Sequence, residues 1–140
     1  MIRWTGLWAG LLAVLLVVAA CGDGQADTTA QAAAVGDPER GRQIWDDGGG
    51  VFLSGNGCSE CHSLDGSEKI ATSRAPTFQG ISGQAGDRVP GLSAEEYLRE
   101  SIVDPAAYIV EGYSDFMPKG FRILLSEEDI DNLVAFLLTE

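Results

Sequence analysis

The sequence predicts an all-α fold with three to four short helices, and three observations support that prediction. Apolar residues recur at the three- and four-residue spacing of an amphipathic helix near the end of the chain. Ser93 and Ser126 are each followed by acidic residues, as at the first turn of a capped helix. No convincing run of alternating apolar and polar residues argues for a strand. A length of 140 residues allows one domain and hardly two.

The first helix is expected to begin at Asp37-Pro38, because Asp is a good N-cap and Pro fits the first turn. One face of it carries Gly41, Ile44 and Trp45, and three consecutive glycines, Gly48–Gly50, end it. A glycine inside a short helix costs about 1 kcal/mol relative to alanine. We therefore interpret Gly41 as a place where another helix crosses closely.

Two further helices follow from capping patterns and apolar spacing. Ser93 to Glu96 has the form of a capping box, and Asp104-Pro105 stops the helix that it opens. The apolar face of this helix contains Leu98, Ile102 and Val103. The last helix begins at Ser126, and its apolar stripe consists of Ile130, Leu133, Val134, Phe136 and Leu137.

The connections between these helices are too long for a compact domain. Residues 63–92 are rich in Gly, Ser and Pro, and about thirty residues without regular structure are unusual in a domain of this size. Three or four short helices also supply a thin core. Both difficulties disappear if a large apolar cofactor forms the centre and the loops wrap around it.

The N-terminus has the features of an export signal. Arg3 precedes an uncharged stretch, rich in Leu and Val, that runs through Ala20. Val18-Ala19-Ala20-Cys21 looks like a bacterial lipoprotein processing site, at which residues 1–20 are removed and Cys21 becomes an acylated first residue. Two alternatives stay open: an uncleaved signal anchor, since the stretch is just long enough to span a bilayer, and a simple buried cysteine.

Residues 21–36 are expected to form a flexible tether, and residues 37–140 the folded domain. Between Gly22 and Gly36 hardly any branched or aromatic side chain is available to offset the entropy of ordering. The whole chain has a formal charge of −12, and removal of Arg3 with the signal would leave −13. An acidic chain of this kind argues against DNA or RNA as a partner. The excess charge either keeps an exported protein soluble or steers it to a basic surface.

The most informative motif is Cys58-Ser59-Glu60-Cys61-His62. C-x-x-C-H is the attachment signature of c-type haem, in which the two thiols add to the porphyrin vinyl groups and the histidine binds the iron. The alternatives are a disulfide, a thioredoxin-like redox pair and half of a zinc site. A redox pair would follow a strand, and none is expected here; half of a zinc site would need a second chain.

With this motif, residues 37–140 resemble the small monohaem class I cytochromes c, in the style of the domains that serve bacterial terminal oxidases. The resemblance implies three to four short helices wrapped around one covalently bound haem c, held through Cys58 and Cys61. It also implies that the helix of Gly41 and Trp45 crosses the helix of Leu133 and Phe136. Ala75-Pro76-Thr77-Phe78 is similar to the segment in which a proline carbonyl accepts the Nδ1–H of the iron-binding histidine, so Pro76 would orient His62.

Met117 is the expected second iron ligand. It is the only methionine besides Met1, it lies on a loop before the last helix, and Pro118 follows it as in the family. Residues 97–102, Asp104-Pro105 and Gly112-Tyr113 also resemble the stretch that leads to this ligand. The alternative is a core methionine that fills a gap. Ligation by His62 and Met117 fills both axial positions, which suits electron transfer and leaves no place for a small-molecule substrate.

The sequence therefore predicts an exported electron carrier in a respiratory chain, tethered through Cys21 to the outer face of the cytoplasmic membrane or facing the periplasm. Redox proteins with a basic docking surface are the expected partners. Three alternatives stay open: a small haem enzyme such as a peroxidase, a gas sensor in which Met117 is displaced, and a subunit of a larger oxidoreductase. Residues that could contact the haem propionates or line its rim are Lys69, Arg74, Arg88, Lys119, Arg122, Tyr97 and Tyr113.

Overall fold

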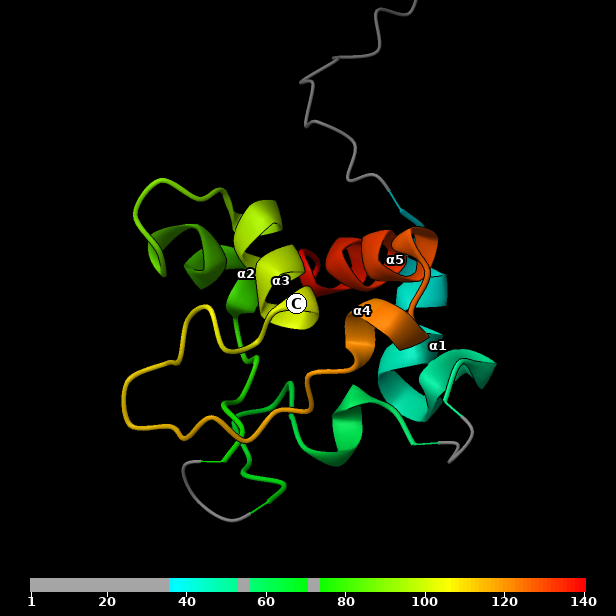
Figure 1. The fold of residues 1–140 in the computed structure, drawn as a ribbon, viewed down its shortest axis with the longest axis horizontal. Helices are drawn as coiled ribbons and strands as arrows, with labels where there is room; N and C mark the ends of the chain where they lie inside the picture. The colour runs from blue at the N-terminus through cyan, green and yellow to red at the C-terminus, as the bar shows by residue number, and fades with distance from the viewer. Residues whose placement is uncertain (1–35, 53–55, 71–73) are drawn as a thin grey trace, which may run out of the picture. The chain divides into compact units, whose positions relative to one another are not determined.

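The computed structural model describes residues 36–52, 56–70 and 74–140. Within these ranges the chain forms five α-helices and no strand (Figure 1). The expected signal peptide at residues 1–20, the acylation site Cys21 and all of the expected tether except Gly36 lie outside the described residues. None of the helices described is both long enough and apolar enough to cross a bilayer.

Three helices of ten or eleven residues carry the fold: α1 (Pro38–Asp47), α3 (Ala94–Val103) and α5 (Glu127–Leu137). All three were expected from the sequence, and their local signals are present. The Asp37 side chain accepts hydrogen bonds from the amides of Glu39 and Arg40, and Gly48 ends α1 in the left-handed conformation with φ of 78°. Ser93 and Ser126 each form a complete capping box, the latter with Asp129.

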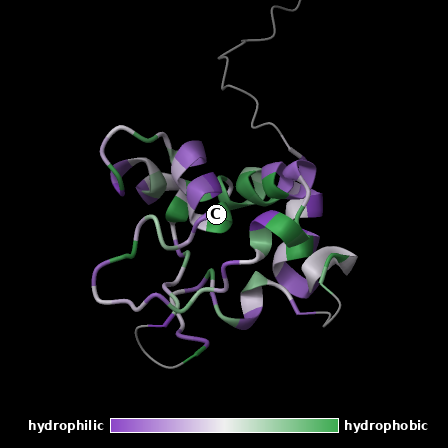
Figure 2. Cartoon of the chain, viewed as in Figure 1, coloured by the Kyte–Doolittle hydropathy of each residue, from purple (hydrophilic) through white to green (hydrophobic). Residues whose placement is uncertain are grey.

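The crossing of α1 and α5 forms the centre of the apolar core. A Cβ atom on Gly41 would collide with the backbone carbonyl of Asn132 and lie 2.7 Å from the Cβ of Phe136, so only glycine permits this approach. The Asn132 Oδ1 accepts a 2.6 Å hydrogen bond from the Asp37 amide, and the rings of Trp45 and Phe136 lie 5.9 Å apart. The first turn of α5 is acidic, and from Leu133 to Leu137 the helix is apolar (Figure 2). The close helix crossing expected from Gly41 is confirmed.

Helix α3 packs on the same core from another side. Tyr97, Leu98 and Ile102 are buried in the apolar cluster. On the outer side, the Arg99 guanidinium donates to the Glu127 carboxylate at 3.0 Å and to the Asp131 carboxylate, and so joins α3 to α5. Hydrogen bonds from Ser93 lower the pKa of the exposed Glu96 carboxyl that closes the capping box.

The expectation that residues 63–92 lack regular structure is wrong in part. A single turn, α2 (Ile81–Gln84), is followed by a 3₁₀ turn at Ala85–Asp87, and Ile81 and Ala85 are buried in the core. The Ser82 hydroxyl donates to the Glu140 backbone oxygen at 2.9 Å. A second single turn, α4 (Phe121–Leu124), precedes α5 and was also not expected. Four residues are too few to display a helical period, so tertiary contacts decide these two turns.

The Gly41 contact generates the first prediction. Gly41→Ala should lower the free energy of unfolding by about 1–3 kcal/mol or more, because the added methyl group meets backbone that cannot move aside without separating the helices. Chemical denaturation followed by circular dichroism measures the loss. Gly83→Ala is the matched control: its Cβ would meet nothing within 4 Å, and alanine should stabilise this turn by about 0.5–1 kcal/mol. Equal losses in both variants would contradict the close crossing.

Candidate functional site

The Cys58–His62 segment is held against the last turn of α1. The Ser59 hydroxyl donates to the Asp46 carbonyl at 2.9 Å. Just before the motif, a Cβ on Gly57 would collide with the Trp45 carbonyl, so backbone lies directly on backbone there. The motif itself turns tightly, with the His62 amide donating to the Cys58 carbonyl at 3.0 Å. Helix α1, which is fixed by its crossing with α5, thereby fixes the position of both cysteines and of His62.

The orientation of the His62 ring is set by one hydrogen bond. Its Nδ1 lies 2.8 Å from the backbone oxygen of Pro76. A carbonyl oxygen only accepts, so Nδ1 carries the proton and Nε2 keeps a lone pair. Burial lowers the pKa of His62, and the bond to Pro76 opposes that shift less strongly. The neutral imidazole with a free Nε2 is the form that binds a metal ion.

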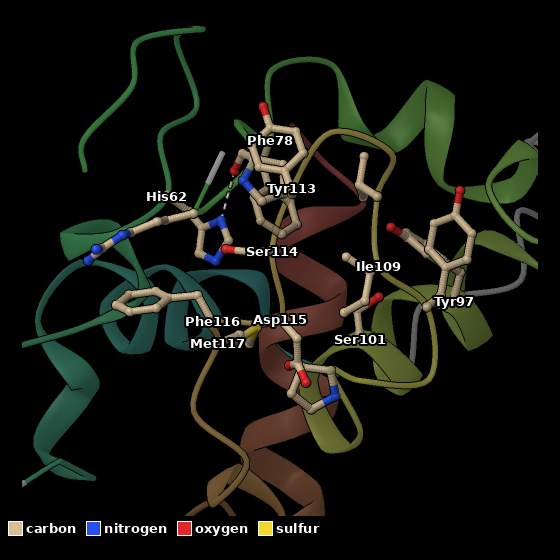
Figure 3. Close-up of a pocket in the computed structure, with 15 residues that line it drawn as sticks. His62, Phe78, Tyr97, Ser101, Ile109, Tyr113, Ser114, Asp115, Phe116 and Met117 are labelled. Carbon is tan, nitrogen blue, oxygen red and sulfur yellow. Dashed lines mark hydrogen bonds between the residues drawn. The ribbon is translucent and has the colours of Figure 1, made fainter. Parts of the chain in front are cut away.

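Two aromatic rings and two hydrogen bonds to the Ser63 carbonyl hold this arrangement in place. The Phe78 ring meets the His62 ring edge-on at a centroid distance of 4.9 Å (Figure 3). The centroid of the Trp45 ring lies 6.2 Å from that of the His62 ring. The Phe78 amide donates to the Ser63 carbonyl at 2.7 Å, and the Thr77 hydroxyl donates to the same carbonyl at 3.2 Å. The segment that supplies the Pro76 carbonyl is therefore bound directly to the residue that follows His62.

Cys58 and Cys61 are free thiols on the wall of an apolar cavity of about 310 Å³. Burial raises the pKa of the Cys58 thiol to about 11, so this sulfur keeps its proton at neutral pH. The motif follows a helix and a turn rather than a strand. Within the described ranges, no group of three or more His, Cys, Asp or Glu residues gathers as a metal site.

The cavity brings together residues far apart in the sequence. Its wall contains the two cysteines, His62 and, from the loop between α3 and α4, Met117. A second cavity of about 80 Å³ is lined by His62 and Met117 as well, and both cavities also share Arg74 and Phe116. In Figure 3, His62 and Met117 approach this space from separate segments of the chain. Two possible iron ligands, one nitrogen and one sulfur, thus border the same space as the two thiols.

The comparison with protein families agrees with this geometry. The family model described as Cytochrome c matches residues 38–140. The chain belongs to the cytochrome c family. Among curated proteins, none matches the sequence. The all-α fold predicted from the sequence is confirmed, and the cofactor of this cytochrome c is a covalent haem c, attached through Cys58 and Cys61.

The residues present fit this group. Both thiols are unpaired and line one cavity, which is bordered by apolar and aromatic side chains and by the free Nε2 side of the histidine. A thiol adds across a vinyl double bond without an oxidant, so two unpaired cysteines at this spacing supply both sulfurs of the attachment. When bound, the haem supplies an iron that gains or loses one electron; the chain supplies its anchoring and its surroundings.

Of the residues expected at the haem rim, three line a cavity and four do not. Arg74 lines both cavities, and Tyr97 and Tyr113 line the smaller one. Lys69, Arg88, Lys119 and Arg122 line neither; Lys119 bonds to Asp115 at 2.6 Å and Arg88 to Gln84 at 2.9 Å. Sequence reasoning missed several wall residues of the larger cavity: Phe52, Asn56, Phe116, Phe121 and Leu124. No sequence pattern distinguishes them, because they come from three separate loops and turns.

Removal of the attachment sulfurs provides the second prediction. Cys58→Ala should leave haem bound through one thioether, and the reduced pyridine complex should absorb at longer wavelength because one vinyl group stays conjugated with the ring. Loss of both sulfurs, in Cys58→Ala with Cys61→Ala, should abolish haem staining on a denaturing gel. Ser59→Ala, which removes only the hydrogen bond to Asp46, is the control and should retain both thioethers. An unshifted spectrum in Cys58→Ala would contradict attachment through that sulfur.

Proposed function

We propose that this cytochrome c carries single electrons in a respiratory chain, with its haem iron bound by His62 and Met117. Haem-based electron transfer follows from the family. The ligand pair is supported by one observation above all: His62 and Met117 border both cavities, and the His62 Nδ1–H bonds to Pro76, so that Nε2 is left for the iron. Pro76 is the positioning residue for this ligand.

This ligand set favours a carrier over an enzyme. A neutral imidazole and a thioether together fill both axial positions, and the soft sulfur stabilises ferrous iron and raises the reduction potential. The chain's own contribution is to hold the imidazole still: Phe78 and Trp45 restrict its ring, and the Pro76 carbonyl sets its tautomer. Little then has to move when an electron arrives or leaves.

A second candidate function is a gas sensor or small haem enzyme in which Met117 is displaced. The observation in its favour is the smaller cavity, which places Tyr97, Ser101 and Asp115 in the same lining as Met117. Polar groups of this kind would be needed to bind or activate a small ligand. Addition of carbon monoxide to the ferrous protein separates the two functions, since a stable methionine ligand leaves the spectrum unchanged.

The third prediction concerns Met117. The ferric protein should show the weak far-red band that a thioether bond to iron produces, and Met117→Ala should abolish the band and lower the reduction potential. Met117→His should restore a low-spin spectrum without that band. Ile123→Ala, on the neighbouring turn and 89% exposed, is the control and should change neither property. Persistence of the band in Met117→Ala would exclude Met117 as the ligand.

We propose that the carrier is a lipoprotein anchored through Cys21 at the outer face of the cytoplasmic membrane. The support is the apolar stretch that stops at Cys21 and the polar segment that follows it. Acylation with two or more chains holds a protein stably on a bilayer, whereas a single chain does not.

Cys21→Ser provides the fourth prediction: the cytochrome should lose its acyl mass and retain the mass of residues 1–20, because processing removes them only at an acylated Cys21. Fractionation of exporting cells, followed by mass spectrometry, measures both changes. Cys58→Ala is the control, because it removes a cysteine without touching the anchor. A wild-type protein that carries no acyl mass and retains residues 1–20 would favour an uncleaved signal anchor.

We propose that the redox partners of this protein have a basic surface, with which they dock onto it. The 9 basic and 21 acidic residues leave a net negative field that attracts cations at long range.

As a fifth prediction, electron exchange with the cationic complex tris(phenanthroline)cobalt should slow as ionic strength rises, since the screening length falls from about 30 Å at 0.01 M to about 8 Å at 0.15 M. Exchange with anionic hexacyanoferrate should accelerate. Identical salt responses for the two reagents would contradict electrostatic steering.

A further inference from the structure

The chain between α1 and the haem motif places an aromatic ring on the wall of the large cavity. After α1 ends, Gly48–Gly50 form a 3₁₀ turn, and the Val51 amide donates to the Gly48 carbonyl at 2.7 Å. A Cβ on Gly48 would lie 2.7 Å from the Phe52 ring, so the glycine allows this ring to lie directly on the end of α1. Phe52 is half-buried and lines the same cavity as Cys58 and Cys61.

Phe52 meets a second ring from the other end of the domain. Phe121, the first residue of α4, lies with its ring centroid 5.8 Å from that of Phe52, edge-on at 67°. It also lines the large cavity, four residues after Met117. The pair thus joins the segment before the attachment cysteines to the segment after the proposed sulfur ligand. An edge-on pair of this separation is a favourable aromatic contact that excludes water.

The position of the pair has a consequence for the cofactor. Ferric haem carries one more positive charge than ferrous haem, and an apolar, water-free surrounding disfavours the more highly charged state. Both rings border the same cavity as the two attachment sulfurs, so they would cover that side of a bound haem. Removal of the shield should stabilise the ferric state and lower the reduction potential.

We infer that Phe52, paired with Phe121, is a potential-setting residue that shields the attachment side of the haem from water. The role rests on the proposed electron-carrier function and deepens it. Phe52 acts here as a wall and not as a ligand. Its influence on the potential therefore differs from that of Met117, which acts through its bond to iron.

The test compares midpoint potentials of the full-length haem-containing protein in a graded series. The potential should fall from wild type to Phe52→Leu and further to Phe52→Ala, as the apolar cover shrinks. Oxidation of the ferrous form by a small hydrophilic reagent should become severalfold faster in the same order. Phe121→Ala should lower the potential too, and adding Phe52→Ala to it should lower the potential by less than Phe52→Ala does alone, because the two rings form one cover.

Val51→Ala is the matched control for a purely structural role. Val51 is the neighbour of Phe52 and packs against the same core, but it lines neither cavity. The Val51→Ala substitution should reduce the stability of the protein without changing its midpoint reduction potential. An unchanged potential in Phe52→Ala, or an equal fall in Val51→Ala, would overturn the inference. If the alanine variant does not mature, Phe52→Leu decides alone: a lowered potential supports the role and an unchanged one overturns it.

The far-red band separates this result from the proposed ligation. All Phe52 variants should keep the band that wild type shows, because Met117 is untouched. Absence of the band in wild type would remove Met117 as a ligand, yet a fall in potential across the Phe52 series would still support the shield. If the band persists and the potential stays constant across the Phe52 variants, the proposed electron-carrier function stands and the inferred role of Phe52 is wrong.

Discussion

Helix α1 crosses α5 at Gly41 with backbone against backbone, and the remaining parts of the cytochrome are placed relative to that contact. Its energetic basis is apolar burial around Ile44, Trp45 and Phe136, made possible by a residue without a Cβ. The C-terminal half of α1 then supports the haem motif directly, through the Asp46 carbonyl and the Trp45 backbone. A change at the crossing would therefore displace the attachment cysteines without touching them.

The second level of organisation is the position of His62. A buried imidazole in a fixed tautomer requires one acceptor at Nδ1 and nothing that competes for Nε2. The Pro76 carbonyl supplies the acceptor, and the rings of Trp45 and Phe78 leave the imidazole little freedom to turn. Met117 borders the same cavities as His62 and is carried by the loop between α3 and α4. The two proposed ligands thus come from separate segments of the chain.

Apolar rings and charges serve separate purposes in this molecule. The cavity walls are largely apolar and aromatic, whereas acidic residues lie in the exposed first turns of α3 and α5. There they cap helices and complement the helix dipole, as well as adding to the negative field of the protein. Two charged residues are exceptions: Asp115 lines the smaller cavity, and Arg74 lines both. The Arg74 guanidinium lies 4.6 Å from the Phe116 ring centroid. This contact links the Pro76 segment to the Met117 loop.

Local signals in the sequence determined the three long helices and the chemistry of attachment. Capping by Asp37, Ser93 and Ser126 involves residues within four positions of each other. The C-x-x-C-H motif is likewise recognised from the spacing of its own residues, so both features can be predicted without knowledge of the tertiary structure. The tertiary structure alone decided the single turns α2 and α4, the cavity walls and the pairing of Phe52 with Phe121. The physical reason is distance along the chain. Phe52 and Phe121 are far apart in sequence, and local propensities do not determine which distant side chains become buried against each other.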